Sequence, residues 1–131
     1  MTKSDNGSMR CPCLSGETYE NCCGPLLAGG AAPTAERLIR SRFTAFARGE
    51  AAHLLRTWHP STRPRSLELD EDILWRRLEI LGTEHGGPFE TSGVVLFEAF
   101  YRDADGNGSL RERSRFVRES GNWLYLDGAP G

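Results

Sequence analysis

Apolar side chains between Thr34 and Arg48 recur at helical spacing and predict an amphipathic helix. The recurring positions are Leu38, Ile39, Phe43, Phe46 and Ala47. Intervals of three and four residues place these side chains on one side of a helix, which is typical of an element that covers a core. Thr34 is suited to cap the first turn, and Gly49 to end the last one. The opposite side would carry Arg37, Arg40 and Arg48, which we interpret as a solvated face.

Two further segments with helical character are shorter. Residues 50–58 carry apolar side chains at helical spacing, and Pro60 requires this helix to end before it. Residues 70–76 predict another helical turn, with Asp70 as its cap and the apolar side chains after it turned inward. Together with the first helix, these segments are expected to cover one face of a sheet.

The C-terminal half of the chain has the composition of β-strands. Four segments there alternate in polarity or are rich in Val, Phe and Tyr: residues 77–81, 91–102, 110–118 and 122–126. Glycine-containing turns separate most of them, as expected for hairpins between antiparallel strands. Helices followed by consecutive hairpins predict an α+β fold in which the helices pack on a curved antiparallel sheet.

Alternation along the third of these strands divides its charged side chains between the two faces of the sheet. Glu112 shares a face with Phe116, whereas Arg113 falls on the opposite face. Because Phe116 is expected in the core, Glu112 should point inward. A buried carboxylate needs a partner, and we expect Arg42 or Arg63 to supply it.

Length and composition indicate one domain with a small appendage. The chain has 131 residues, of which 38% are hydrophobic, and a chain of this size can bury a substantial core. No apolar run approaches the ~18 residues of a membrane-spanning helix, so no membrane partner is expected. The formal net charge of −2 argues against nonspecific binding to nucleic acid.

All four cysteines of the chain lie close together near the N-terminus. They form two pairs, Cys11 with Cys13 and Cys22 with Cys23. Four thiolates can close a tetrahedron around one ion, and zinc suits this set because it has no redox chemistry and needs only four soft ligands. The sequence therefore predicts a zinc knuckle with these four cysteines as the metal ligands.

Three other interpretations of the cysteines compete with zinc binding: disulfides, a redox pair or another metal, and unliganded thiols. Two disulfides are the usual arrangement in a short secreted chain, but residues 1–9 are polar and lack the apolar segment of a signal peptide. A redox pair would usually show a C-x-x-C motif, and the chain has none. Reduced, metal-bound thiolates are consistent with the cytoplasm.

The cysteine segment resembles the SEC-C motif, a zinc-binding module found at the end of the SecA translocation ATPase. The resemblance rests on the pattern C-P-C-x-S-G-x-x-Y-x-x-C-C-G at residues 11–24. Further stretches, at residues 24–27, 34–46, 57–64 and 112–116, are similar to the YchJ-like family of bacterial proteins. This resemblance implies a zinc knuckle followed by a cone-shaped domain like that of nuclear transport factor 2 (NTF2-like), and it implies no activity.

The resemblance and the composition together divide the chain into four parts. These are a disordered tail (residues 1–9), a SEC-C-like zinc knuckle (residues 10–27), a small-residue linker (residues 28–33) and the NTF2-like domain (residues 34–131). Because every strong helix and strand signal falls in the last part, we expect removal of the metal to unfold only about the first thirty residues.

Residues 103–108 match the first half of an EF-hand calcium loop. They have oxygen-bearing side chains at the first, third and fifth positions and glycine at the sixth. The twelfth position is Ser114 instead of glutamate, and the flanking segments read as strands. We therefore interpret these residues as a polar hairpin turn, with calcium binding as the alternative.

No catalytic constellation is recognised, so two functional hypotheses stand. The first is a protein-interaction or adaptor module, in which the knuckle presents a rigid surface to an unidentified protein partner. The second is a small-molecule-binding or enzymatic cone, with a pocket formed by Trp58, His59, Trp75, Phe97 and Arg113. A large pocket with a shifted titrating group would favour the second, and a filled cone beside exposed apolar side chains on the knuckle would favour the first. The sequence alone favours the first.

Overall fold

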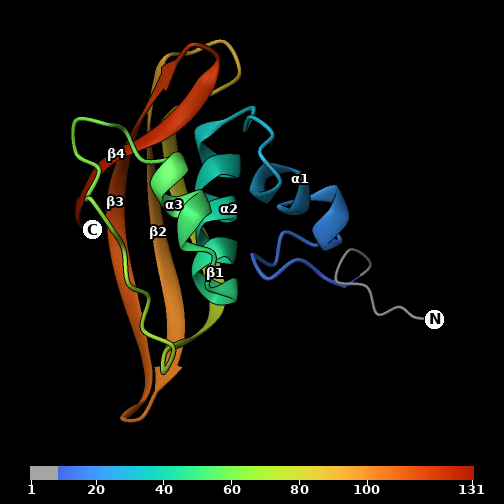
Figure 1. Ribbon diagram of the computed structural model, residues 1–131, viewed down its shortest axis with the longest axis vertical. Coiled ribbons are helices and arrows are strands. Elements are labelled where there is room, and N and C mark those ends of the chain that lie inside the picture. The colour runs from blue at the N-terminus through green and yellow to red at the C-terminus, as the bar shows by residue number, and fades with distance from the viewer. Residues whose placement is uncertain (1–8) are drawn as a thin grey trace.

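The computed structural model describes residues 9–131, so the predicted tail lies outside the described residues except for Met9. The elements, in chain order, are a 3-10 turn (Tyr19–Asn21), α1 (Gly24–Leu27), α2 (Ala35–Arg48), α3 (Ala51–Arg56), β1 (Leu74–His85), β2 (Ser92–Asp103), β3 (Gly106–Glu119) and β4 (Asn122–Pro130). They form three layers: a curved sheet, then α2 and α3 on one of its faces, then the cysteine-containing segment with α1 on the far side of α2 (Figure 1). None of the described helices has both the length and the apolar character needed to cross a membrane.

The sheet is built from consecutive antiparallel hairpins. Its strands lie in the order β1-β2-β3-β4, which confirms the predicted α+β class. The turn between β2 and β3 closes where Asp103 pairs with Gly106, and Asp105 N donates a hydrogen bond to Asp103 Oδ1. The hairpin interpretation of this segment is confirmed. Ser114, the twelfth position of the alternative calcium loop, is fully buried in the sheet.

Helix α2 forms where the apolar pattern predicts it. Thr34 Oγ1 accepts a hydrogen bond from Arg37 N at 3.1 Å, and Gly49 ends the helix in the left-handed conformation with a φ of 74°. Leu38 and Phe43 are buried in the core that α2 shares with the sheet. Burial of each such side chain contributes about 1.5–3 kcal/mol.

The helical turn predicted at residues 70–76 is wrong, because β1 begins within this segment. Asp70 Oδ1 accepts a hydrogen bond from Asp72 N at 2.9 Å, which makes a local turn and not a helix cap. The residues that follow join the sheet, where Trp75 lies opposite Tyr101. Pairing with β2 therefore outweighs the local helical pattern, and β1 is longer than predicted.

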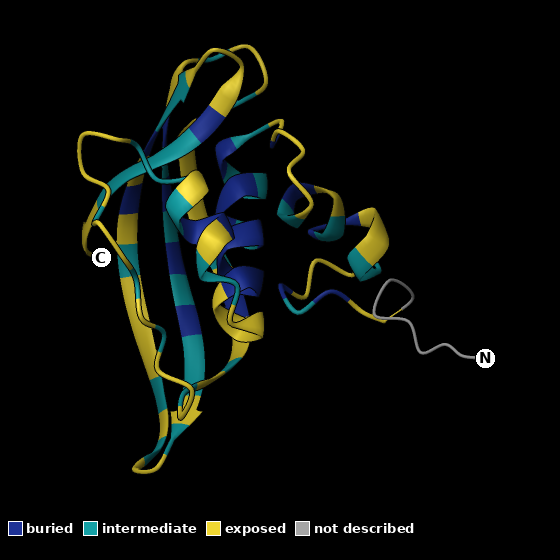
Figure 2. Cartoon of the chain, viewed as in Figure 1, coloured by how far each residue is buried: buried dark blue, intermediate teal, exposed yellow. Residues whose placement is uncertain are grey.

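The core is continuous from the cysteine segment through α2 to the sheet. One buried cluster contains all four cysteines together with Leu38 of α2 and Phe116 of β3. Figure 2 shows the buried positions running across α2 and the strands behind it. Shared burial argues against the expectation that loss of a metal would unfold the knuckle alone.

A buried histidine links α2 to α3. Arg56 Nη2 donates a hydrogen bond to His53 Nδ1 at 2.9 Å, so the proton of the neutral ring lies on Nε2. His53 Nε2 donates to Ser41 Oγ at 2.9 Å, and Ser41 Oγ donates to Leu38 O at 2.7 Å. The hydrogen bonds of this series, from Arg56 through His53 to Ser41, can all form only while the His53 ring is neutral.

The first prediction concerns His53 and pH. Burial, followed by the charges of Arg56 and Arg42, lowers the pKa of His53 to about 4 from the usual 6.5. Between these values the unfolded chain binds a proton that the native protein does not, so the free energy of unfolding decreases as the pH falls through this range. We expect His53→Gln to show a shallower decrease than the wild type in urea unfolding from about pH 7 to about pH 5.

The matched control for this measurement is His85→Gln. His85 is 72% exposed and contacts Glu90 at the protein surface, so its replacement should leave the wild-type pH dependence unchanged. If the free energy of unfolding decreased equally with falling pH in the wild type and in His53→Gln, the assignment of this stability loss to His53 would be contradicted.

Candidate metal centre and central cavity

A tight turn brings the first two cysteines together. Cys11 N donates a hydrogen bond to Glu17 O, and Leu14 N donates to Cys11 O, both at 2.9 Å. The chain therefore reverses directly after Cys13. Leu14 and Gly16 take left-handed conformations with φ of 59° and 99°, and at Gly16 this has no steric cost because glycine lacks a Cβ.

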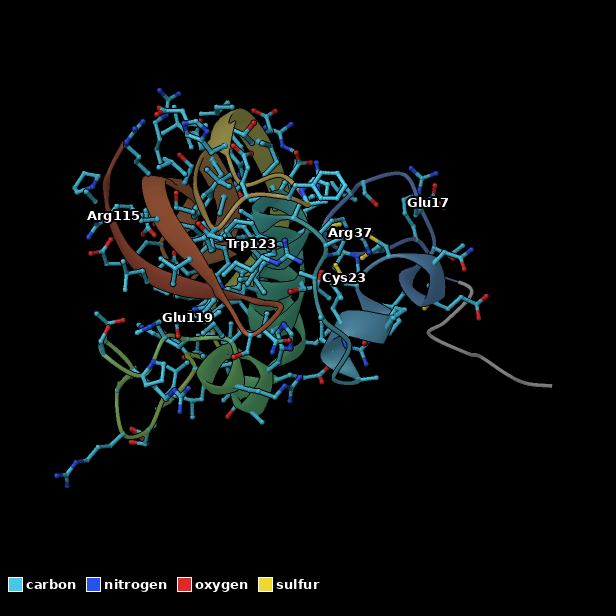
Figure 3. The ribbon with its side chains drawn as sticks, turned by 90° about the horizontal axis from the view of Figure 1, so that it is seen from above. Glu17, Cys23, Arg37, Arg115, Glu119 and Trp123 are labelled. Carbon is cyan, nitrogen blue, oxygen red and sulfur yellow. The ribbon has the colours of Figure 1, made fainter. Side chains whose placement is uncertain are left out.

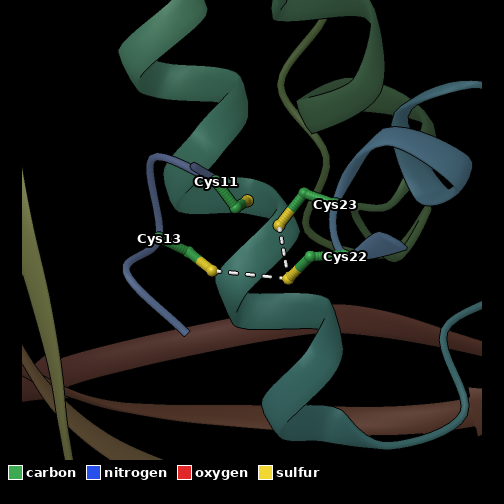
Figure 4. Close-up of side chains that lie close together, drawn as sticks. All are labelled: Cys11, Cys13, Cys22 and Cys23. Atoms are coloured by element: carbon green, nitrogen blue, oxygen red, sulfur yellow. Dashed lines mark hydrogen bonds between the residues drawn. The ribbon is translucent and has the colours of Figure 1, made fainter. Parts of the chain in front are cut away.

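Cys22 and Cys23 precede helix α1 and face the first pair (Figure 4). The four sulfur atoms lie within 4.8 Å of one another, and all four residues are buried. Cys22 Sγ is 3.6 Å from Cys13 Sγ and 3.9 Å from Cys23 Sγ. Sulfur atoms bound at about 2.3 Å to one tetrahedral ion lie roughly 3.8 Å apart. The cluster could therefore hold one metal ion.

The thiols of this cluster are strongly perturbed by their surroundings. Burial raises the pKa of Cys22. Hydrogen bonding with Cys11 lowers the pKa of Cys13 and raises the pKa of Cys23, because the crowded sulfurs share protons and negative charge unequally. Four thiols packed in this way are a better environment for a cation than for four protons.

Two arginines of α2 tie the cysteine segment to the helix. Arg37 Nη2 donates to Cys22 O at 3.0 Å, and Arg40 Nη1 donates to Cys13 O at 3.1 Å. Figure 3 shows Arg37 next to Cys23, between α2 and the knuckle. The expectation that Arg37 and Arg40 belong to a solvated helix face is therefore wrong. The knuckle covers this side of α2, and the positive charges there favour thiolates.

A cavity of about 230 Å³ lies between α2 and the sheet. Its apolar wall is formed by aromatic side chains from both layers and by three aliphatic ones: Phe43, Phe46, Trp58, Trp75 and Phe97, with Ile39, Leu78 and Leu110. Ala99 of β2 also lines the cavity with a small side chain, which leaves space in front of the strand. Three polar residues, Arg42, Glu112 and Tyr125, complete the wall.

Arg42 is buried in this wall with 3% of its surface exposed. Its Nη1 donates to Leu54 O and to Thr57 Oγ1, both at 2.9 Å, whereas Nε and Nη2 find no acceptor among residues 9–131. The guanidinium carbon lies 5.1 Å from the ring centroid of Trp58 and 4.5 Å from that of Tyr125. Burial lowers the pKa of Arg42 to about 10, which still leaves it charged at neutral pH.

Glu112 reaches the cavity from β3, as the alternation of the strand predicts. Glu112 Oε2 accepts hydrogen bonds from Ser114 Oγ at 2.6 Å and from Tyr125 OH at 3.3 Å. Burial, reinforced by the charge of Glu112, raises the pKa of Tyr125 to about 12. The predicted arginine partner is wrong: within the described residues these hydroxyl groups replace it, and Arg63 donates to Trp58 O instead.

The structure brings together three residues predicted to line a pocket: Trp58, Trp75 and Phe97. Sequence reasoning did not include Arg42 and Tyr125 in that pocket. Arg42 lies four residues after Leu38 and four before Phe46, and this helical spacing is the signal for its inward position. Tyr125 reaches the cavity because a register shift in the β3–β4 pairing places it opposite Phe116, and no sequence pattern marks that shift.

His59 and Arg113 do not line the cavity, which corrects their predicted place in it. His59 Nε2 lies 2.8 Å from Glu119 Oε2, since His59 leaves the end of α3 along the neighbouring strand β4 and turns its ring toward the protein surface. Arg113 Nη2 lies 2.8 Å from Glu84 Oε2. Its adjacent residue Glu112 takes the inward position, so Arg113 must face the other side of the sheet.

Family models and curated relatives match nearly the whole of this arrangement. Residues 34–128 match the model described as "YchJ, middle NTF2-like domain", and residues 10–25 match the SEC-C motif. A UPF0225 protein of Streptomyces coelicolor is 56% identical over 119 residues, which cover 90% of this chain and 93% of that protein. A UPF0225 protein of Corynebacterium efficiens is 52% identical over 118 residues, which cover 89% and 90% of the two chains.

Two solved structures are similar over almost the entire chain. A SEC-C motif containing protein from Rhodopseudomonas palustris is 34% identical, with a TM-score of 0.82 over 94% of this chain and 99% of that one. Another, from Psychrobacter arcticus, is 24% identical and shares the fold, with a TM-score of 0.75 over 95% and 85% of the two chains. The resemblance inferred from the sequence is confirmed, and the chain belongs to the YchJ-like family, here with a SEC-C motif ahead of its NTF2-like domain.

Proposed function

We propose that this protein binds zinc through Cys11, Cys13, Cys22 and Cys23, and a small molecule in its central cavity. The observation that carries the second part is the guanidinium of Arg42, which lines the cavity and whose Nε and Nη2 bond no acceptor in the described residues. These two nitrogens are not among the sealed, unpaired polar atoms of residues 9–131, so they stay within reach of a ligand. A mostly apolar cavity with a few convergent polar groups is typical of a ligand site.

The ligand chemistry favours zinc at the cysteine cluster. Four thiolates in a tetrahedron form a closed ligand set that suits zinc and leaves no position for a substrate. The metal would therefore act by holding the knuckle together. It needs reduced thiols, which favours a reducing compartment such as the cytoplasm.

The knuckle in turn supports one wall of the cavity. Cys11 Sγ lies 3.8 Å from Thr44 Oγ1 of α2, and Thr44 is two residues from Arg42 on the same helix. Two residues along a helix point in nearly opposite directions. The metal-held segment and the cavity thus pack on opposite sides of α2, and the metal would hold the helix that presents Arg42.

The second prediction is that the purified protein carries one zinc ion per chain. We expect Cys23→Ser to lose the zinc and to lower the melting temperature by more than about 10 °C, because the buried cysteine cluster is part of the common core. Elemental analysis and thermal unfolding measure the two effects. Amide exchange after chelation should show lower protection in α2 as well as in the knuckle.

Ser15→Ala is the control for this experiment. It removes the hydroxyl group 3.1 Å from Cys22 Sγ but keeps all four thiolates, so it should retain zinc. Wild-type protein prepared without chelator that contains no metal, and whose thiols react freely, would contradict the zinc site.

A protein-interaction role is the second candidate, and a surface groove favours it. The groove is shared by Leu14 of the knuckle with Arg76, Tyr101 and Arg102 of the sheet. Leu14 is 45% exposed, and the arginines add positive charge beside it. An acidic segment of a protein partner would complement this surface.

The third prediction tests that groove. A partner captured by the wild type should be lost with Arg76→Glu and Arg102→Glu, whereas Arg115→Glu, a change at a position outside the groove lining, should leave capture unchanged. Arg115 is paired with Asp127 at 2.6 Å and is not part of the groove lining. Equal capture by all variants would exclude the groove as the docking site.

A further inference from the structure

We infer that the cavity accepts a small, flat, uncharged molecule that carries a primary carboxamide on an aromatic or similar apolar ring. This inference rests on the proposed function of the cavity and assigns the chemical class of its ligand. The carboxamide oxygen would accept hydrogen bonds from Arg42, its NH₂ group would donate to Glu112, and the ring would lie against the aromatic wall.

The acceptor part of the ligand follows from the unpaired nitrogens of Arg42. Arg42 uses only Nη1 within the described protein, on Leu54 O and Thr57 Oγ1. The ring of Trp58 also lines the cavity, whereas its Nε1–H is sealed by protein atoms and is not available to a ligand. The two side chains are in contact, with the guanidinium of Arg42 over the Trp58 ring. One acceptor oxygen beside Arg42 would engage the guanidinium nitrogens that bond nothing in the described protein.

The donor part of the ligand follows from Glu112. Its Oε2 accepts from Ser114 and Tyr125, and its Oε1 has no donor among the described residues. The carboxylate is held in place by close packing, because Gly128 of β4 lies so near that a Cβ atom there would overlap with Oε2. A ligand N–H group would fill the vacant lone pairs of Oε1.

The charge of the site selects a neutral ligand. A guanidinium and a carboxylate line the same cavity, and the field of Glu112 acts on Arg42. A ligand carboxylate would suit Arg42 but oppose Glu112, and a ligand ammonium would do the reverse. A primary carboxamide places an acceptor and two donors on one planar carbon without net charge, so it matches both residues.

The size and the walls of the cavity define the rest of the molecule. An apolar cavity of about 150 Å³ can hold benzene, so about 230 Å³ accommodates one six-membered ring with one substituent. Trp75 already packs edge-on against Phe43, with ring centroids 6.2 Å apart, and flat rings pack well against such walls. Benzamide is the simplest probe with these properties.

The fourth prediction compares benzamide with benzoate and benzylamine. Each probe is titrated into the zinc-loaded full chain, and binding is followed by NMR through the indole N–H signals and by calorimetry. We expect benzamide to bind at least about tenfold more tightly than either charged probe, since each of these loses one charge-assisted hydrogen bond and meets one like charge. The Trp58 indole signal should shift with benzamide.

Variants at two residues that line the cavity, Glu112 and Ala99, make the test more specific. Glu112→Gln removes the charge that opposes an anion, so benzoate should gain on benzamide by about tenfold. Glu98→Gln is the matched control, since Glu98 lies outside the cavity lining and contacts Ser109 and Arg111 instead. Ala99→Leu fills the cavity while keeping Arg42 and Glu112, so it should abolish binding of all three probes.

The outcomes separate this inference from the proposed function. Binding of all three probes with equal affinity, abolished by Ala99→Leu, would overturn the carboxamide assignment and leave a ligand-binding cavity. Preferential binding of benzoate would overturn it in favour of an anionic ligand. Absence of binding by every probe would overturn the carboxamide assignment, and a melting temperature raised by Ala99→Leu would then indicate a packing defect, against the proposed ligand site.

Discussion

Burial of helix α2 on two opposite sides is the constraint on which the rest of the structure depends. One side packs on the sheet through Leu38 and Phe43, and the other side, with Thr44 fully buried, faces the cysteine segment. A helix covered on both sides has few places for charged side chains. Its arginines must therefore reach the carbonyl groups of neighbouring segments, as Arg37, Arg40 and Arg42 do.

This constraint separates satisfied polar groups from unsatisfied ones. The Ser41–His53–Arg56 series is complete at the histidine, because both ring nitrogens of His53 and the hydroxyl group of Ser41 have partners. Arg42, the residue next to Ser41 on α2, is only partly paired. The free nitrogens of Arg42 are not among the sealed, unpaired atoms of residues 9–131, so they lie open toward the cavity. This is the feature on which the proposed ligand site rests.

The sequence predicted those features that depend on neighbours along the chain. The cap at Thr34, the apolar side of α2, the polar hairpin after Asp103 and the inward position of Glu112 all follow from local periodicity. The cysteine spacing likewise predicted a cluster, because the ligands lie on two short turns. Each of these features is determined by residues close together in the sequence, within one helix, strand or turn or in two short neighbouring turns.

The errors arose where another layer decides the conformation. Residues 70–76 have a helical pattern, but pairing with β2 draws them into the sheet. The sequence predicts His59 in the pocket, but the adjacent strand β4 turns it toward Glu119. Tyr125 enters the cavity through a register shift between β3 and β4. Strand pairing and register are tertiary properties, so no local pattern could supply them.

The position of α2 also connects the two proposed ligands. Thr44 meets the cysteine cluster and Arg42 meets the cavity from opposite sides of one helical turn. If zinc reduces fraying of this turn, it also reduces the ordering that a cavity ligand must impose on Arg42. Linkage then requires the reverse effect: a molecule bound in the cavity must increase the affinity for zinc by the same factor. The knuckle would in this way act on the cavity through the rigidity of α2, without contact between the two ligands.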